Sequence, residues 1–272
     1  SAAKRASSIG TFGWAMDFLY HFTNRVVDPE SSLIFQLSRL IKLAADADIP
    51  PAVAYILTTG GLTALHKSDR SEQAKTTAQG GSHPLRSINS GSTFLKQALK
   101  CIAKHPSFDR VKTAVGVTQY GLGYRNGPEV MAHLTRTLVE QNFTANTQDA
   151  VKAFYKLERQ AVLDGVNAEW PEANQQFRIY YGLASPCLYL HKDDEGNFTI
   201  RVSFSTQGTR AGCVLGSAGF DIALHHFVYK HLVREFPAFI IKALTDDMPD
   251  FFTANTNAGW FQRYDQLTAL LL

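Results

Sequence analysis

The sequence predicts an α+β protein, in which a mostly helical N-terminal part precedes a mixed part with a small, mainly antiparallel sheet. Apolar residues recur at intervals of three and four over residues 11–45, which is the spacing of a buried helix face. Residues 180–205 hold two apolar runs on either side of a polar turn, as a pair of strands does. We therefore expect one unit over residues 1–160 and a second over residues 161–272.

The N-terminal part is expected to contain several helices and one short strand. The helical pattern of residues 11–45 is broken by DPESS, which also offers an N-cap. Residues 68–82 are polar and small without periodicity, and they predict a loop or a partly disordered insert. The other expected elements are a short helix after Pro50-Pro51, a strand LTALHK after the turn at Gly60-Gly61, a helix over 92–104, and a helix from Pro128 to about Asn142 that follows a Gly-rich loop.

In the C-terminal part, two expected strands lead directly to aspartates. An apolar run within residues 150–163 ends at Asp164, and the β-branched run that begins at Ile240 leads to Asp246 and Asp247. Proline is poorly tolerated inside a sheet, so Pro249 is expected to stop the second run. Helices are expected over residues 217–235 and 258–272.

The composition is that of an ordinary globular protein, with 45% hydrophobic and 19% charged residues in 272. The formal charge of +3 and the isoelectric point near 8.7 permit a nucleic-acid partner but do not indicate one, because such binding needs a local basic patch. No apolar run approaches the roughly 20 residues of a membrane helix. We therefore expect no membrane association.

The cysteines indicate a reducing, intracellular compartment, either nucleus, cytoplasm or organelle. Cys101, Cys187 and Cys213 form no CxxC pair and have no histidine at metal-binding spacing, which argues against a zinc site. The chain begins at Ser1 without a methionine. It is therefore expected to be a fragment or a processed product, in which any targeting segment would have been lost with the missing N-terminus.

The adjacent carboxylates Asp246 and Asp247 have two interpretations. They form either a solvated turn or half of a metal site, and Asp164 after another apolar run favours the second. If the two strand ends are neighbours, the three carboxylates offer the hard oxygen ligands that Mg²⁺ prefers. Two such ions about 4 Å apart clamp the attacking and leaving oxygens of a phosphoryl transfer.

Seven segments, in order along the chain, resemble the reverse transcriptases of non-LTR (LINE-type) retrotransposons. In the palm, LDGVNAEW, YYG with ASP, FSTQGTRAGCVLGSAGFDIALH and LTDD are similar to the family's LDFKNAFN, YYG.PS, S..GVRQGDPLG..LFALAL and YLDD. Upstream, IPPAVAYILTTGGLTALHKSD resembles the fingers segment that leads into LRKPDG. RSINSGSTFLKQALKCI resembles RPIAVGEVLRRLVAKAL, and QYGLGYRNGPEVMAHLTRTL resembles QLGVGVPGGAEAAVHAVR. The resemblance covers about residues 9–270.

This resemblance implies a polymerase right-hand fold, with helical fingers over residues 1–160 packed on a palm over 161–272 and with the thumb absent. It implies an RNA-directed DNA polymerase, a nucleotidyltransferase that uses two Mg²⁺ or Mn²⁺ ions. Its partners would be an RNA template, a primer and dNTPs, with other ribonucleoprotein subunits. Positioning and charge neutralisation carry the rate of such a transfer.

The resemblance also implies roles for single residues. The metal ligands would be Asp164, Asp246 and Asp247, and the incoming triphosphate would meet Lys67 and Arg86. A turn of Gly208, Arg210 and Gly212 would let the backbone approach the nascent base pair. Each of these residues also has an ordinary interpretation, as a solvated cation or as part of a plain turn such as Asp-Gly.

The chain departs from the family pattern at positions that bear on activity. Leu244 replaces the aromatic residue before the aspartates, and RQGDP has become a segment that begins Arg210-Ala211-Gly212. Five residues after Asp164, where the family has a bulky aromatic that excludes a 2′-hydroxyl, this chain has Glu169, with Trp170 one position later as an alternative. An inactive, domesticated domain that serves as a structural or RNA-binding subunit is therefore the second hypothesis, and an unrelated metal-dependent phosphotransferase or nuclease is the third.

Overall fold

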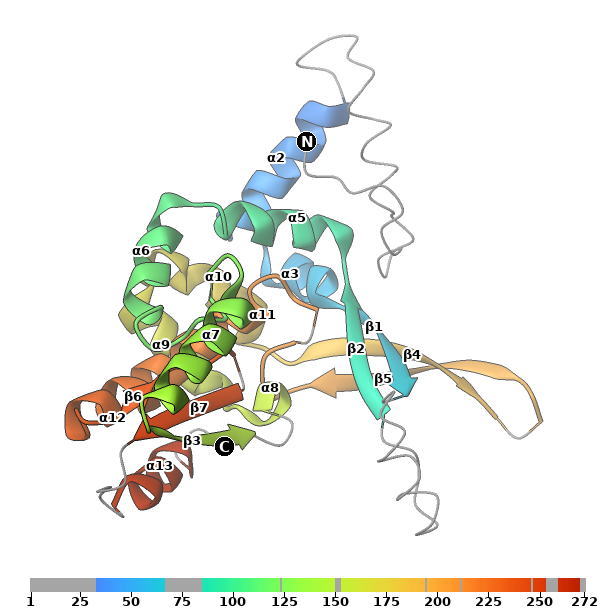
Figure 1. Cartoon of the computed structure of the whole chain (residues 1–272). Coiled ribbons are helices and arrows are strands. Elements are labelled where there is room, and N and C mark those ends of the chain that lie inside the picture. Colours follow the sequence, from blue (N-terminus) through green and yellow to red (C-terminus); the bar gives the residue numbers. More distant parts are fainter. Residues whose placement is uncertain are drawn as a thin grey trace.

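The structure is a computed structural model that describes residues 33–66, 85–122, 124–149, 153–193, 195–210, 212–245, 247–252 and 259–269. It confirms the prediction of a mixed α+β protein (Figure 1). The helices are α2 (Leu33–Ala45), α3 (Pro51–Thr58), α5 (Thr93–Ile102), α6 (Pro106–Val115), α7 (Gly127–Glu140), α8 (Ala153–Lys156), α9 (Arg159–Glu169), the 3₁₀ turn η1 (Pro171–Ala173), α10 (Asn174–Tyr181), α11 (Gly216–Leu224), the π-helical turn η2 (His225–Tyr229), α12 (Lys230–Glu235) and α13 (Gly259–Ala269). The strands are β1 (Gly60–His66), β2 (Leu85–Gly91), β3 (Thr144–Asp149), β4 (Ser185–Lys192), β5 (Phe198–Ser205), β6 (Ile240–Ile241) and β7 (Asp247–Phe252).

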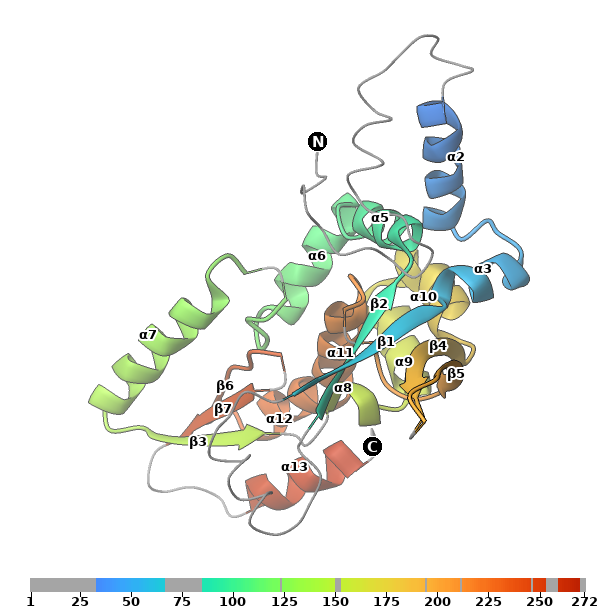
Figure 2. The same ribbon diagram turned by 90° about the vertical axis from the view of Figure 1, so that its right-hand side faces the viewer.

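The strands form two separate sheets. The larger sheet has the order β2-β1-β4-β5, in which only the β1–β4 pair is parallel. The smaller sheet has the order β3-β7-β6 and is antiparallel throughout. Figure 2 shows β3, β6 and β7 side by side at one end of the molecule, apart from β1 and β2.

The core lies where α9 packs against α11 and α10. Gly165 permits the close approach of α11, because a Cβ atom there would lie 3.1 Å from the Cα atom of Ala223. Trp170 is fully buried, stacks on Phe108 with ring centroids 4.6 Å apart, and donates its indole N–H to the Ser107 hydroxyl at 2.9 Å. A residue enclosed in this way contributes packing and is not free to act at a nucleotide site.

The expected strand that ends at Asp164 is wrong, because this segment is helix α9. Val162, from the run that suggested a strand, and Val166 after it are four residues apart, at helical spacing, and both are buried, while Asp164 is exposed. A short apolar run does not by itself distinguish a strand from a buried helix. Contact with α11 and α10 therefore decided the outcome.

The expectation that Pro249 stops its strand is also wrong, because β7 continues through it to Phe252. Leu244 and Asp247 exchange backbone hydrogen bonds, so alternate residues of β7, including Pro249, present their backbone groups toward the same side. On that side the pairing of β6 reaches only Ile241 opposite Asp250. Pro249 therefore occupies a position where the missing N–H breaks no ladder bond.

The β4–β5 hairpin projects from the body (Figure 1). It carries an exposed row of apolar side chains. Phe198, Ile200, Val202 and Phe204 alternate along β5 and are 66%, 71%, 52% and 54% exposed. Leu190, opposite Ile200, is 68% exposed. Alternating apolar residues are typical of a strand with one buried face, yet no described segment of the chain covers this one.

Candidate functional site

Asp247 begins the second strand of a tight hairpin, and Asp246 directly precedes it in the sequence. The Leu244 amide donates to the Asp247 carbonyl at 2.7 Å, and the Asp247 amide donates to the Leu244 carbonyl at 3.2 Å. The connection is therefore Thr245 followed by Asp246, of which Asp246 lies outside the described residues. Thr245 has a φ of 60°, in the left-handed region that the favoured two-residue hairpin turns require.

Strand β3 brings a third aspartate to this turn. In the antiparallel pairing of β3 with β7, Asp149 is the partner of Asp247. Directly opposed residues in such a pair have Cα atoms roughly 4.5–5.5 Å apart. The backbone positions of Asp149 and Asp247 are thus adjacent at the end of the sheet where the hairpin turns.

Asp149 is a residue that the sequence reasoning missed, although a signal was present. The family segment LDFKNAFN can be aligned with QDAVKAFY, which retains Asp149, Ala153 and Phe154. It can equally be aligned with LDGVNAEW, which contains Asp164. Local likeness does not choose between the two alignments, whereas the strand register favours Asp149 because it lies opposite Asp247.

Asp164 and Glu169, the two residues that the LDGVNAEW alignment assigned to the nucleotide site, contact neither Asp247 nor Thr245 in the hydrogen bonds described below. Asp164 is exposed on α9 and accepts a hydrogen bond from the Gln160 side chain at 2.8 Å. Glu169, at the end of the same helix, accepts from Lys230 at 2.8 Å and contacts His226 at 2.7 Å. Burial alone would raise the pKa of Glu169, but the hydrogen bonds from Lys230 and His226 hold that pKa below its ordinary value.

A backbone segment from Thr118 to Gly121, here named the brace, supports the strand that leads into the turn. The Ala243 amide donates to the Thr118 carbonyl at 2.7 Å, and the Tyr120 amide donates to the Ala243 carbonyl at 2.6 Å. Gly121 is needed for the close approach, since a Cβ atom there would lie 2.3 Å from the Thr245 hydroxyl and 2.8 Å from its amide nitrogen. The brace acts as a short parallel strand beside Ala243.

The side chain of Gln119 joins the brace directly to the turn. Its amide oxygen accepts from the Thr245 amide at 2.6 Å and from the Gly121 amide at 3.0 Å. Its amide nitrogen donates to the Thr245 carbonyl at 3.1 Å. Gln119 is fully buried, so these bonds satisfy a side chain that has no access to water.

His225 lies behind the brace, in the π-helical turn η2, and gives a pH-dependent prediction. Its Nδ1 lies 2.9 Å from the Thr118 hydroxyl, and burial lowers its pKa, partly opposed by Glu169 and reinforced by Lys230 and His226. The unfolded chain therefore binds more protons below about pH 6.5, the ordinary value for histidine. The stability that neutral His225 contributes is complete above that pH and is lost as the pH falls below it.

We expect the melting temperature to decrease as the pH is lowered from about 7 to 5.5, and to decrease less steeply in His225→Gln. Gln keeps a polar group beside Thr118 but does not titrate. The measurement is thermal unfolding of both proteins across this pH range. Equal slopes in the two proteins would contradict the assignment to His225.

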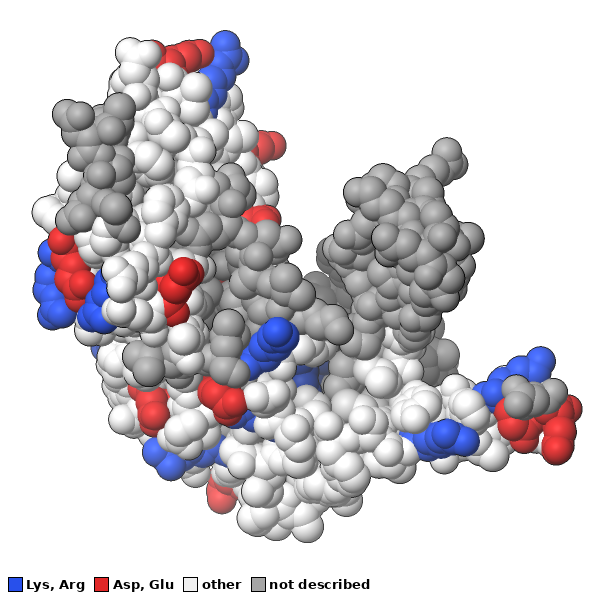
Figure 3. All heavy atoms as spheres, turned by 90° about the horizontal axis from the view of Figure 1, so that it is seen from below, with Lys and Arg blue, Asp and Glu red and all other residues white. Residues whose placement is uncertain are grey.

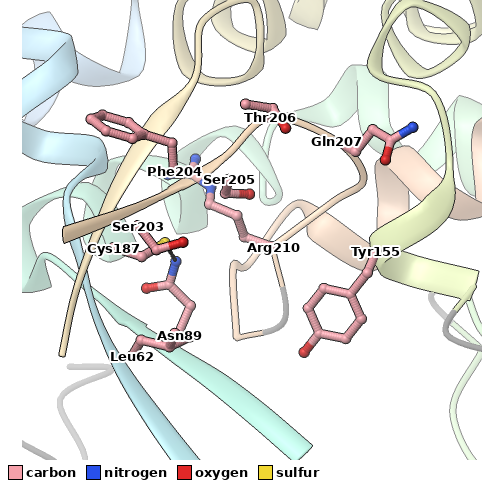
Figure 4. A pocket seen from close by; sticks show the side chains of 10 residues that line it. All are labelled: Leu62, Asn89, Tyr155, Cys187, Ser203, Phe204, Ser205, Thr206, Gln207 and Arg210. Atoms are coloured by element: carbon pink, nitrogen blue, oxygen red, sulfur yellow. Dashed lines mark hydrogen bonds between the residues drawn. The ribbon is translucent and has the colours of Figure 1, made fainter. Parts of the chain in front are cut away.

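A second feature is a cavity of about 250 Å³ between the larger sheet and α8 (Figure 4). It is lined by Leu62, Asn89, Tyr155, Cys187, Ser203, Phe204, Ser205, Thr206, Gln207 and Arg210. The loop that starts at Gly208 lies against α8: the Gly208 amide donates to the Leu157 carbonyl at 2.8 Å, and the Thr209 amide donates to the Phe154 carbonyl at 2.7 Å. This loop and α8 therefore form one side of a single polar and apolar cavity.

Gly208 and Gly212 both have positive φ, of 66° and 89°. A Cβ atom on Gly208 would lie 2.1 Å from the Phe154 carbonyl oxygen, and one on Gly212 would lie 2.8 Å from the Asn89 carbonyl oxygen. The two glycines thus serve close backbone contacts within the chain. Their expected approach to a base pair remains a prediction.

Arg210 points inward and holds the chain together. It is 7% exposed, its two terminal nitrogens donate to the carbonyls of Thr58 at 2.9 Å and Tyr180 at 3.1 Å, and its guanidinium lies 4.9 Å from the centre of the Tyr181 ring. Arg159, which the sequence reasoning missed, donates to the Gly208 carbonyl at 3.1 Å. Two buried arginines therefore fix the loop beside the cavity.

The remaining predicted residues are only partly covered by the structure. Lys67 lies outside the described residues, as does the polar segment 68–82. The backbone of Arg86 pairs with Leu65 between β1 and β2, and nothing is described of its side chain. The triphosphate-binding roles of Lys67 and Arg86 stay predictions.

Of the three aspartates that could bind a metal ion at the turn, the structure describes the side chain of Asp247. Among the described side chains, no three His, Cys, Asp or Glu residues are close enough to hold an ion. The side chains of Asp246 and Asp149 are not among those that the structure describes. Carboxylates at two paired strand positions, Asp149 and Asp247, together with Asp246, which precedes Asp247 in the sequence, are a donor set of the kind that Mg²⁺ or Mn²⁺ prefers.

The surface adds two findings. On the face shown in Figure 3, Lys and Arg are interspersed with Asp and Glu and form no single basic area among the described residues. In the part of the chain that the structure covers, no helix is both long and apolar enough to cross a bilayer.

Comparison with known proteins finds similarity to solved structures but to no protein family. No family model and no curated protein matches the chain. It is similar to a solved structure of apo telomerase from Candida tropicalis, truncated from the C-terminal domain, with 13% sequence identity and a TM-score of 0.47. The similar region covers 79% of this chain and 47% of the telomerase chain. This chain therefore spans about half the length of the telomerase chain. At this identity and TM-score, the likeness decides neither family nor function.

Proposed function

We propose that this chain is a reverse-transcriptase-like domain that performs RNA-directed DNA synthesis with two divalent metal ions. One observation carries the proposal: the register of β3 and β7 pairs Asp149 with Asp247, the second aspartate of the predicted LTDD motif. The ordered series of seven family-like segments, of which LTDD is one, also supports it. Fingers and palm, with an RNA template, a primer and dNTPs as partners, belong to the same proposal.

In this proposal, Asp149, Asp246 and Asp247 hold the metal ions, and Asp149 takes the role first given to Asp164. Asp149 ends a strand beside the aspartate turn, whereas Asp164 lies on the exposed face of helix α9. Bound Mg²⁺ or Mn²⁺ would supply charge neutralisation for the attacking and leaving oxygens. The chain's own contribution is a rigid strand pair that holds the carboxylates in place.

The pairing of β3 with β7 also gives a new candidate for the residue that excludes nucleotides with a 2′-hydroxyl. Five residues after Asp149 is Phe154, an aromatic residue as in the family pattern. Its ring stacks on Phe220 with centroids 4.5 Å apart, and its carbonyl accepts from Thr209 beside the cavity lined by Tyr155. In the proposal, the role of excluding the 2′-hydroxyl therefore belongs to Phe154, and not to Glu169 or Trp170.

We expect Phe154→Val to increase the use of ribonucleotides relative to deoxyribonucleotides by about tenfold or more, because a smaller side chain leaves room for a 2′-hydroxyl. The measurement is the ratio of kcat/KM for a dNTP and the matching rNTP in primer extension. Trp170→Phe and Glu169→Gln are the control variants, and we expect neither to change this ratio. A shift in the ratio in Glu169→Gln but not in Phe154→Val would restore the first assignment.

The experiment that tests the function is primer extension on an RNA template with dNTPs and Mg²⁺ or Mn²⁺. Extension that requires the metal would support the proposal. RNA binding in EDTA without extension would support the second candidate, an inactive domain that binds RNA or ribonucleoprotein subunits. That candidate is favoured by the altered segment around Arg210, whose guanidinium is used inside the protein. Binding that weakens steeply with salt would identify phosphate contacts.

A further inference from the structure

Thr245 occupies a conformation that needs support. It is a β-branched residue with a φ of 60°, a region that such residues rarely adopt, and it directly precedes Asp246. Conformations of this kind persist only where the surrounding structure holds them. The question is which group supplies that support.

The Gln119 side chain meets both backbone groups of Thr245. It accepts from the Thr245 amide at 2.6 Å and donates to the Thr245 carbonyl at 3.1 Å. A primary amide carries an acceptor and a donor in one neutral plane, so it can satisfy both groups of one residue at once. Glu at this position would lack the donor, and an apolar side chain would lack both.

Gln119 is itself held in place. Its oxygen also accepts from the Gly121 amide at 3.0 Å, and the brace is hydrogen-bonded to Ala243 from both flanking residues, Thr118 and Tyr120. Gln119 is fully buried, so water does not compete for these bonds. The brace, Gln119 and Thr245 thus form a rigid connection that ends one residue before Asp246.

We infer that Gln119 is a positioning residue for the aspartate turn: by locking the backbone of Thr245, it fixes the start of β7, which carries Asp247. The inference rests on the proposed function, because it assigns Gln119 to the metal-dependent step. It adds a residue from a segment about 125 positions away in the chain, as the hydrogen bonds to Thr245 require. A purely structural role would instead affect the stability of the whole domain.

The test compares Gln119→Leu and Gln119→Glu with the matched control Gln176→Leu. Gln176, on α10, also donates from its side-chain nitrogen to a backbone carbonyl, that of Ala45, at 3.1 Å. We expect Gln119→Leu to lower kcat by about 10- to 100-fold and to raise the Mg²⁺ concentration that gives the half-maximal rate. The KM for dNTP should change by less than about twofold. Gln119→Glu, which keeps the acceptor, should lie between.

Hydrogen exchange provides a readout of the bonds themselves. In Gln119→Leu the amides of Thr245 and Gly121 should exchange faster, while amides of α9 and α11 keep their protection. Unchanged kcat and metal dependence in Gln119→Leu would overturn the inference. A kcat loss that comes with equal losses of RNA binding and of global protection would also overturn it, because that pattern indicates general unfolding.

Failure of the proposed function can be separated from failure of the inference. If the wild-type chain extends no primer, the polymerase proposal fails, and Mn²⁺ binding measured by water proton relaxation then tests Gln119. Weaker Mn²⁺ binding in Gln119→Leu than in Gln176→Leu would support the positioning role. Equal binding in the two variants, or no Mn²⁺ binding by the wild type, would overturn it.

Discussion

Asp149→Asn is expected to lower metal-dependent primer extension by about 10³-fold or more, since a lost metal ligand removes several kcal/mol of charge stabilisation. Asp164→Asn, the same change on the exposed face of α9, should leave the rate within about twofold of wild type. The difference follows from the fold: Asp149 pairs with Asp247 across β3 and β7, whereas Asp164 contacts Gln160 of its own helix.

The measurement is single-nucleotide extension on an RNA template over a range of Mg²⁺ and Mn²⁺ concentrations. Thermal unfolding of both variants serves as the control for folding, because neither substitution changes the size of the side chain. RNA binding in EDTA should be the same in both. If Asp164→Asn lost activity and Asp149→Asn retained it, the metal site would not be at the β3–β7 strand end.

The second large effect is expected for Gly208→Ala. A Cβ atom would lie 2.1 Å from the Phe154 carbonyl oxygen and 2.6 Å from the Tyr155 Cα atom, both of them backbone atoms that cannot rotate away. Together with the left-handed φ of 66°, this overlap should destabilise the fold by about 2–5 kcal/mol. The loop beside the cavity would have to move away from α8.

Gly91→Ala is the matched control, because a Cβ atom at this position in β2 has no neighbour within 4 Å. We expect it to change the free energy of unfolding by less than about 1 kcal/mol. Urea unfolding followed by circular dichroism would measure both variants. A Gly208→Ala protein as stable as Gly91→Ala would show that the contact between the Gly208 loop and α8 is not held in solution.

Strand pairing and sequence resemblance both indicate the aspartate turn as the candidate site. The motif LTDD runs from Leu244, which forms a bridge with Asp247, into strand β7, and β7 also pairs with β3. The brace on the other side comes from the Gly-rich segment that resembles QLGVGVPGG in the family pattern. Three separate parts of the chain therefore meet at the turn, and this convergence is what makes it the candidate site.

The sequence alone determined the fold class and several local features. Helical spacing predicted the helix over 217–235, where α11, η2 and α12 form one continuous helical stretch, and the polar turn after Lys192 predicted the β4–β5 hairpin. Proline positions predicted the starts of α3 and α7. These features depend on residues close together in the chain, so their signals can be read from short segments.

The tertiary structure decided which aspartates are neighbours and what Gln119, Arg159 and Arg210 do. A run such as the one before Asp164 is compatible with a strand or with a buried helix, and packing against α11 selected the helix. The pairing of Asp149 with Asp247, and the bonds of Gln119 to Thr245, join residues about 100 or more positions apart. Such contacts depend on strand register and burial, which are properties of the whole folded chain and not of any short segment.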